Sequence, residues 1–181
     1  MTIQTAAVEK GNNSAYQQKL MRLLGDRDPI SVMSGTADVL AKIVERHPAK
    51  VLRTRPFVGK WTPNEIIGHL SDSEWVYGFR IRLILCEESP TILGMDQDLW
   101  VAGQKHNDRE PRDLVTMFRN LRAANLVLWK QMTPRDFVRT GMHNERGPES
   151  LGVMLRMNAG HDLSHIDQIN RYVAAIADSA K

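Results

Sequence analysis

Cysteine and aromatic residues are scarce in this chain of 181 residues, which has one cysteine, Cys86, and 6% aromatic residues. A single cysteine excludes an internal disulfide bond, and no Cys-x-x-Cys pair is present to hold a structural zinc ion. Cys86 closes the apolar run 81–86, so we expect it to be a small buried hydrophobic residue. This cysteine usage is typical of a cytoplasmic protein.

Long apolar runs and an excess of one charge are also missing. No run approaches the length of a membrane span, and residues 1–13 lack the pattern of a secretory signal. The net charge of +3 comes from 24 basic and 21 acidic residues, which are interleaved. Nucleic-acid-binding proteins usually show a basic stripe or a reading motif. We therefore expect neither a membrane nor a nucleic acid as partner, but a small-molecule substrate.

The length and composition fit one folded domain. Apolar residues make up 42% and charged residues 25%, which is ordinary for a globular protein with a substantial core. We expect a flexible N-terminal arm over residues 1–13 and a single domain over residues 14–181. No segment sustains an apolar–polar alternation, so we expect no sheet and a loop over residues 140–149.

Helix-capping signals mark the beginnings of the long helices. The run Thr62–Pro63–Asn64–Glu65 combines an N-cap, a first-turn proline and a capping-box glutamate, and apolar residues then recur at helical spacing. This pattern predicts a helix over residues 63–88. Similar signals predict helices over residues 111–132 and 151–177.

Earlier helical segments are shorter. We expect one over residues 15–24, and another that begins at Asp28–Pro29. Gly35 is expected to interrupt this second segment, with Thr36 capping its continuation over residues 37–47.

Four principal helices joined by mixed short and long connections predict an all-α fold, an antiparallel four-helix bundle. The longest connection spans residues 89–110 and contains a short helical piece over residues 96–103. A connection of this length often covers a functional site.

Two histidines, His161 and His165, stand four residues apart in the last predicted helix. This spacing puts both imidazoles on one helix face, one turn apart, as in a two-ligand metal clamp. A reactive zinc site takes a third protein ligand, and His69 lies on or beside the core-facing stripe of its own helix. Hydrogen-bonded packing or a surface position for these histidines stays open as an alternative at this point.

Other polar residues are candidates for supporting roles. Asn158 and Gln168, one turn from the histidine pair, could orient a ring nitrogen or a bound water, or could be ordinary surface residues. His143 is a candidate for the rim of the site. We expect His47 and His106 to be solvated.

Competing motifs are absent. Di-iron bundles need two Glu-x-x-His motifs, whereas this chain has a single Asp162-x-x-His165. The zinc-protease motif His-Glu-x-x-His and glycine-rich phosphate loops do not occur.

An ordered set of motifs resembles the DinB/YfiT-like superfamily over residues 28–175. It comprises the run 61–70 with Asp72 and Glu74, then Arg80, Gly94–Met95–Asp96, Leu121–Arg122, and the final run 160–169. The resemblance implies a four-helix bundle in which three histidines, by position His69, His161 and His165, hold a divalent metal, often nickel or zinc. Arg80, Asp96 and Glu74 match family positions and are expected to form ion pairs that brace the long connection.

The resemblance also implies a chemistry. Family members with an assigned activity use the metal to activate a low-molecular-weight thiol, such as bacillithiol, mycothiol or glutathione, for S-transfer or isomerisation. Three neutral imidazoles leave the ion its double charge, so that a water or thiol at its open position loses a proton near neutral pH. Three interpretations follow: a metal-dependent thiol S-transferase, a metal-dependent hydrolase, or a non-catalytic metal-binding scaffold that forms a homodimer or binds a small molecule.

Overall fold

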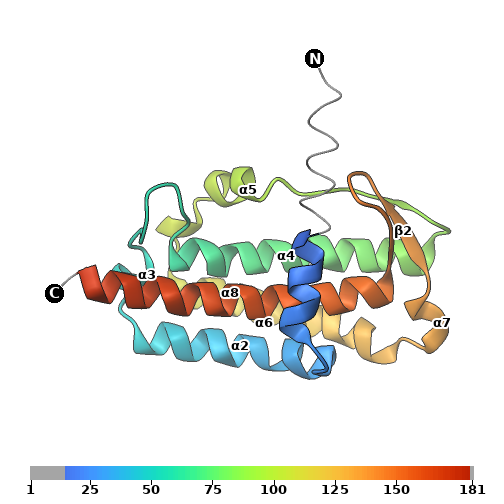
Figure 1. Ribbon diagram of the computed structural model, residues 1–181, viewed down its shortest axis with the longest axis horizontal. Coiled ribbons are helices and arrows are strands. Elements are labelled where there is room, and N and C mark those ends of the chain that lie inside the picture. The colour runs from blue at the N-terminus through green and yellow to red at the C-terminus, as the bar shows by residue number, and fades with distance from the viewer. Residues whose placement is uncertain (1–14, 180–181) are drawn as a thin grey trace, which may run out of the picture.

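The computed structural model describes residues 15–179, most of which form a four-helix bundle (Figure 1). The predicted all-α bundle is confirmed, while the arm predicted over residues 1–13 lies outside the described residues. The four bundle helices are α2 (Pro29–Arg46), α4 (Pro63–Cys86), α6 (Pro111–Gln131) and α8 (Leu151–Ser179).

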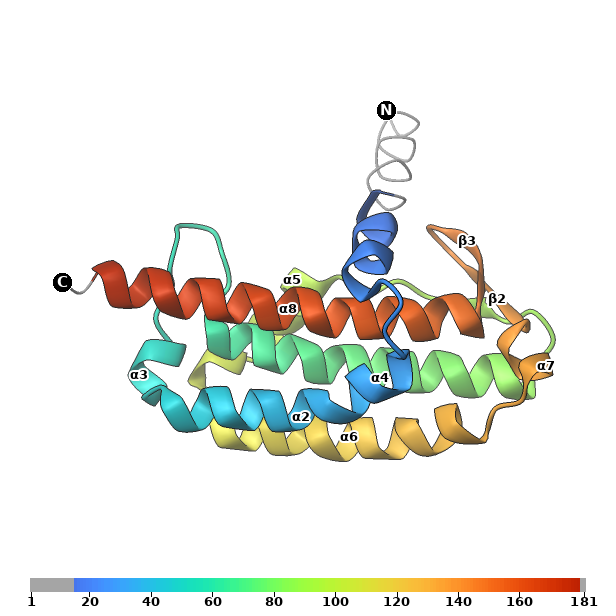
Figure 2. The same ribbon diagram turned by 60° about the horizontal axis from the view of Figure 1, so that its bottom comes forward.

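Each bundle helix packs against two others. The contacts join α4 to α6 and α8, and α2 to the same two helices, so that α2 lies diagonally opposite α4. Helices α4 and α8 run antiparallel, as do α2 and α6, whereas α4 and α6 run parallel (Figure 2). The chain must therefore travel back along the bundle between α4 and α6. Residues 87–110 make this return and lie over α4, which explains the length of the connection.

Helix α4 begins where its capping residues predict. The Thr62 side chain accepts a hydrogen bond from the Glu65 backbone N–H, and the Glu65 carboxylate accepts one from the Thr62 N–H. Both bonds satisfy backbone donors that the first turn would otherwise leave unpaired. Fixing this first turn places His69 about two turns into the helix.

The predicted interruption of α2 at Gly35 was wrong, because α2 continues through it. The Thr36 hydroxyl oxygen lies 3.1 Å from the Val32 carbonyl one turn back, as in a continuous helix. Glycine costs a helix about 1 kcal/mol. Burial of the apolar face of α2 outweighs that cost.

Short elements occupy the connections: α3 (Ala49–Leu52), β1 (Thr91–Ile92), α5 (Gln97–Gly103), the 3₁₀ turn η1 (His106–Asp108), α7 (Pro134–Phe137), β2 (Thr140–His143) and β3 (Gly147–Ser150). Helix α5 confirms the short helix predicted within the long connection. The Asp96 side chain caps it by accepting a hydrogen bond from the Leu99 N–H.

A small sheet replaces the loop expected over residues 140–149, so the prediction of no sheet was wrong. Strands β2 and β3 form an antiparallel hairpin, and β1 pairs in parallel with β2. These strands are too short to show an alternating pattern in the sequence. Gly141 lies so close to α4 that an added Cβ would sit 2.9 Å from Ile84.

The core consists of two apolar clusters, one toward each end of the bundle. Leu70 and Phe118 belong to one cluster, and Ile84 and Trp129 belong to the other. On each bundle helix, buried polar residues lie between the two clusters, so a polar layer crosses the middle of the bundle. The candidate site lies in this layer.

Cys86 is exposed at the end of α4, so its predicted burial was wrong. The apolar run 81–86 turns with the helix and points only part of its side chains inward, among them Ile81 and Ile84. Within residues 15–179, no helix combines the length and apolar character that crossing a membrane requires.

Candidate metal centre

Three histidine side chains converge between α4 and α8. The Nε2 atom of His161 lies 3.1 Å from Nε2 of His69 and 3.0 Å from Nε2 of His165. His161 and His165 share one face of α8, and the antiparallel packing of α4 on α8 brings His69 opposite them. The structure thus brings together the three histidines that the sequence singled out.

These distances fit a metal ion bound by three imidazoles. Zinc–nitrogen bonds of about 2.0–2.1 Å imply separations of about 2.9 Å between neighbouring ligands in octahedral geometry and about 3.3 Å in tetrahedral geometry. The two observed separations fall inside this interval. Among the residues described, the cluster contains His69, His161 and His165 without a fourth histidine, cysteine or carboxylate. Such a set leaves room for another ligand, as catalytic zinc sites do.

Gln168 fixes the tautomer of His165. Its Oε1 lies 2.9 Å from Nδ1 of His165, and its Nε2 donates a hydrogen bond to the Tyr172 hydroxyl. The amide oxygen can only accept, so Nδ1 of His165 carries the hydrogen and Nε2 presents its lone pair to the cluster. Gln168 therefore holds the ring in the form that binds metals.

The three imidazoles are buried and neutral. Burial lowers the pKa of His165 to about 4, and it also lowers the pKa values of His69 and His161, whose neighbouring histidines depress them further. The Nδ1 atoms of His69 and His161 have no hydrogen-bond partner in the described part of the chain. Burying three such rings is costly unless something binds them. A cation at the Nε2 atoms would compensate this cost.

The cluster opens toward two polar cavities. The smaller, about 130 Å³, has His69 and His161 in its wall, and the larger, about 780 Å³, has His165 and Gln168 in its wall. The Trp61 ring centre lies 4.8 Å from that of His69 and covers another side. The histidines are thus shielded from bulk water but reachable by a small molecule.

A buried ionic network lies next to the cluster and joins all four bundle helices. Arg122 on α6 donates two hydrogen bonds to Asp162 on α8 and one to Glu74 on α4, and Asp162 also accepts one from Thr36 on α2. Asn158 donates to Glu74, at 3.0 Å, so its amide nitrogen faces this network rather than a histidine ring.

Arg122 stays charged in this network. Its burial disfavours the charge, but Asp162 and Glu74 outweigh that effect and raise its pKa. Burial raises the pKa of Asp162, although Arg122 favours its ionised form. This network was not predicted from the sequence. The signal was present as charged residues at core-facing positions of α4 and α6.

Two further histidines are buried. His106, which we expected to be solvated, is fully buried with Nε2 2.8 Å from the Asp72 carboxylate, so that prediction was wrong. The turn η1 presses its ring against Gly68, where an added Cβ would lie 2.3 Å away. His143 is buried in the hairpin, and it does not belong to the three-histidine cluster.

The expected bracing of the long connection is only partly correct. Glu74 pairs with Arg122 and Asp96 caps α5, so neither forms an ion pair with Arg80. Arg80 does hold the connection, because its guanidinium donates hydrogen bonds to the Leu93 carbonyl.

The fold and the histidine cluster together define a four-helix bundle protein with a candidate metal centre. The sequence profile of the DinB superfamily matches residues 33–169, a range that includes the three histidines and Arg122. The chain therefore belongs to the DinB superfamily.

Two relatives illustrate the similarity. A protein of Oceanobacillus iheyensis, provisionally named a metal-dependent hydrolase, is 30% identical over 112 residues, which are 61% of this chain and 64% of that protein. The chain thus spans just under two thirds of the length of that relative. YfiT of Bacillus subtilis, named in the same way, is 24% identical over 160 residues, 78% of this chain and 88% of YfiT.

The solved structure of YfiT, described provisionally as a metal-dependent hydrolase with an unusual four-helix bundle topology, matches with a TM-score of 0.72. The matched region covers 79% of this chain and 84% of the YfiT chain, with 24% sequence identity. This likeness establishes the fold.

Proposed function

We propose that His69, His161 and His165 bind one divalent ion, zinc or nickel, and that the protein is a metal-dependent enzyme acting on a small molecule. The observation that carries the proposal is the convergence of three buried Nε2 atoms beside polar cavities. A scaffold site would be closed by a fourth protein ligand. The described residues offer none in this cluster.

A divalent ion held by three neutral imidazoles supplies Lewis acidity, which lowers the pKa of a water or thiol that reaches its open side. The protein's own contribution is to keep the three rings neutral, to fix the tautomer of His165 through Gln168, and to exclude bulk water with Trp61. These residues prepare the site before a substrate arrives.

We propose addition or transfer of a low-molecular-weight thiol to an electrophilic small molecule as the reaction. The family resemblance described above supports this assignment. Hydrolysis is the second candidate, and the names of the two relatives favour it. The two reactions differ only in whether a thiol or water attacks.

Metal analysis and product analysis test the proposal together. The purified protein should bind one zinc or nickel ion per chain, and the loaded form should consume a thiol in the presence of an electrophile faster than the metal-free form. Products in which the sulfur of the thiol is bonded to the electrophile support transfer. Products that have gained the elements of water support hydrolysis. Equal rates with and without metal would contradict both.

His165→Ala is the matched variant. It removes one of three ligands while alanine preserves the helix, so metal binding and activity should be lost and the fold kept. His47→Ala, at the C-terminal cap of α2, is the control and should bind metal like the parent. Unchanged metal affinity in His165→Ala would show that His165 is not a ligand.

A further inference from the structure

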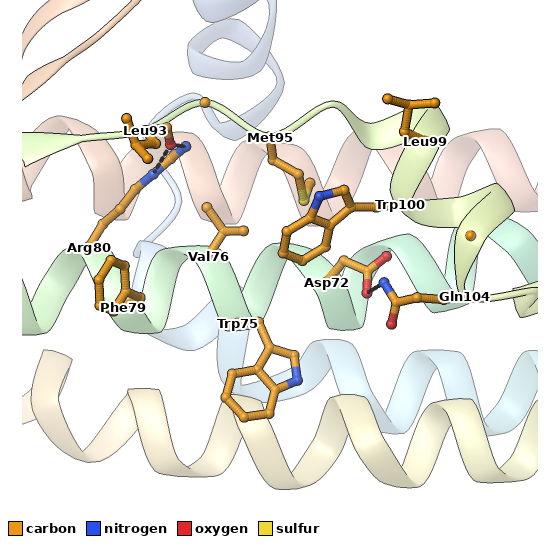
Figure 3. Close-up of a pocket in the computed structure, with 12 residues that line it drawn as sticks. Asp72, Trp75, Val76, Phe79, Arg80, Leu93, Met95, Leu99, Trp100 and Gln104 are labelled. Atoms are coloured by element: carbon orange, nitrogen blue, oxygen red, sulfur yellow. Dashed lines mark hydrogen bonds between the residues drawn. The ribbon is translucent and has the colours of Figure 1, made fainter.

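A third cavity lies outside the bundle, between α4 and the long connection over it (Figure 3). Its volume is about 740 Å³, which is within the range of small-molecule pockets. Met95 and Trp100 point down from the connection, while Val76 and Arg80 rise from α4. The wall is mostly apolar, and several of its aromatic and aliphatic side chains are unusually exposed: Trp75, Phe79, Leu93, Leu99 and Trp100.

The polar side chains of this wall are Asp72, Gln104 and Arg80. Asp72 is held by Gln104 and His106, whereas Arg80 has no charged partner in the described part of the chain. Its side chain is buried, with 6% of the residue exposed, and its guanidinium donates to the Leu93 carbonyl. Among residues 15–179, no carboxylate lies within ion-pair distance of Arg80. The nearby Glu149 already accepts hydrogen bonds from Nε and Nη2 of Arg146.

A buried guanidinium without an anionic partner is costly. Burial lowers the pKa of Arg80, which is the direction expected for such a charge. The Leu93 carbonyl accepts hydrogen bonds from Arg80 but carries no negative charge to balance the guanidinium. An anionic ligand would provide one.

The position of Arg80 links this cavity to the candidate metal centre. Val76, Arg80 and Met95 lie in the wall of the apolar cavity and also in the wall of the small polar cavity that contains His69 and His161. A ligand in the apolar cavity with an anionic end at Arg80 would thus have that end at the wall of the small polar cavity, which His69 and His161 also line.

We propose that the cavity between α4 and the long connection binds an apolar, aromatic carboxylate, with its carboxylate at Arg80 and its apolar body against Val76 and Trp100. The inference that such a carboxylate is the substrate of the enzyme rests on the proposed function. The inference that the cavity binds it does not depend on the metal. A guanidinium pairs well with a carboxylate, and the apolar wall suits a ring.

The test compares two probes of the same shape, 3-phenylpropionate and its neutral amide, by calorimetric titration of the full chain at pH 7.5. The metal-free protein is used first and the zinc-loaded protein second. The carboxylate should bind at least about tenfold more tightly than the amide in both forms, because a charged hydrogen bond replaces a neutral one. Equal affinities in the parent protein, or no saturable binding of the carboxylate, would overturn the proposal.

Variants assign the preference to Arg80. Arg80→Gln should abolish the preference and Arg80→Lys should keep part of it, whereas Arg82→Gln, which removes a charge from an exposed position two residues along the same helix, should leave it unchanged. Trp100→Ala should weaken both probes by a similar factor. An equal loss of preference in the Arg82 variant would contradict the assignment.

The outcomes separate this proposal from the metal proposal. If the chain takes up no metal when zinc or nickel is supplied but still binds the carboxylate, the pocket is supported and the proposed enzyme is contradicted. Binding that requires zinc would show that the anion goes to the ion and would overturn the role of Arg80. If a second copy of the chain covers the cavity, the charge preference will be missing and Trp75→Ala will lower the sedimentation coefficient, which also overturns the proposal.

Discussion

Neutral imidazoles in a buried cluster are the feature on which the proposed chemistry depends. The pKa of His165 lies near 4 because burial disfavours its charged form, so protons do not compete with a metal near neutral pH. The single hydrogen bond from Nδ1 to Gln168 then decides which nitrogen faces the cluster. The candidate metal centre is thus preorganised by Gln168, a residue outside the three-histidine cluster.

Gln168→Leu should weaken metal binding about 10- to 100-fold, because the leucine removes the acceptor that holds the Nδ1–H of His165. Competition with a chromogenic chelator measures the affinity. Asp167→Asn is the control, since Asp167 is exposed and pairs with Arg171 away from the cluster. Equal affinities in the parent and Gln168→Leu would show that the tautomer is fixed in another way.

Among the helices, close contact between two backbones positions a segment that borders the candidate site. Residues 15–24 form the helix that the sequence predicts there, and this helix crosses α8 at Gly160 (Figure 1). Its residues Tyr16, Gln17 and Leu20 line the small cavity. A Cβ at Gly160 would lie 2.3 Å from the Leu20 carbonyl oxygen. Glycine at this position is therefore required by packing.

Gly160→Ala should destabilise the protein by about 1–3 kcal/mol and increase hydrogen exchange over residues 15–24, because the segment must move away from α8. Chemical denaturation and exchange mass spectrometry measure the two effects. Gly35→Ala is the matched control. Among the described residues, nothing outside its own stretch of helix lies within 4 Å of where an alanine Cβ would sit, so alanine should stabilise α2 by about 0.5–1 kcal/mol. Destabilisation of both variants alike would contradict this explanation.

At the scale of the whole molecule, the polar layer specifies how the four helices fit together. Arg122 contacts side chains or backbone of the other three helices, including the Met33 carbonyl on α2. The apolar clusters on either side could pack in more than one way, since apolar contacts are not directional. We interpret the network as the feature that selects one arrangement.

Arg122→Leu should lower the free energy of unfolding by about 3–5 kcal/mol, because it leaves the carboxylates of Glu74 and Asp162 buried without their cation. Arg119→Leu on the same helix is the control. Its ion pair with Asp38 is exposed and should contribute less than about 1 kcal/mol. Urea denaturation compares the two variants. Similar losses in the free energy of unfolding would show that the buried network does not stabilise the fold more than an exposed ion pair does.

The stability of the metal-free protein should fall as the pH is lowered from about 6.5 to about 4. The unfolded chain takes up protons on its histidines near pH 6.5, whereas the folded His165 does so only near pH 4, so acid favours unfolding in this window. His165 alone should contribute about 3 kcal/mol. Urea denaturation of the parent and His165→Ala, both with chelator, isolates this contribution. The same pH dependence in both proteins would show that His165 is not the cause.

Features that depend on residues close together along the chain could be predicted without the structure. The capping box at Thr62 and Glu65 fixed the beginning of α4, and the four-residue spacing put His161 and His165 on one face, because helical hydrogen bonds and side-chain spacing join residues three and four apart. The core-facing position of His69 made it a candidate for the third ligand, and the superfamily resemblance assigned it that place.

Contacts between residues far apart in the sequence became visible only in the tertiary structure. It paired Arg122 with Asp162 and Glu74, buried His106 on Asp72, formed the hairpin over residues 140–150, and left Arg80 without a carboxylate among the residues described. No periodicity encodes these outcomes. They depend on how closely whole helices approach and which side chains then meet, and that is set by packing across the bundle rather than by local hydrogen bonding.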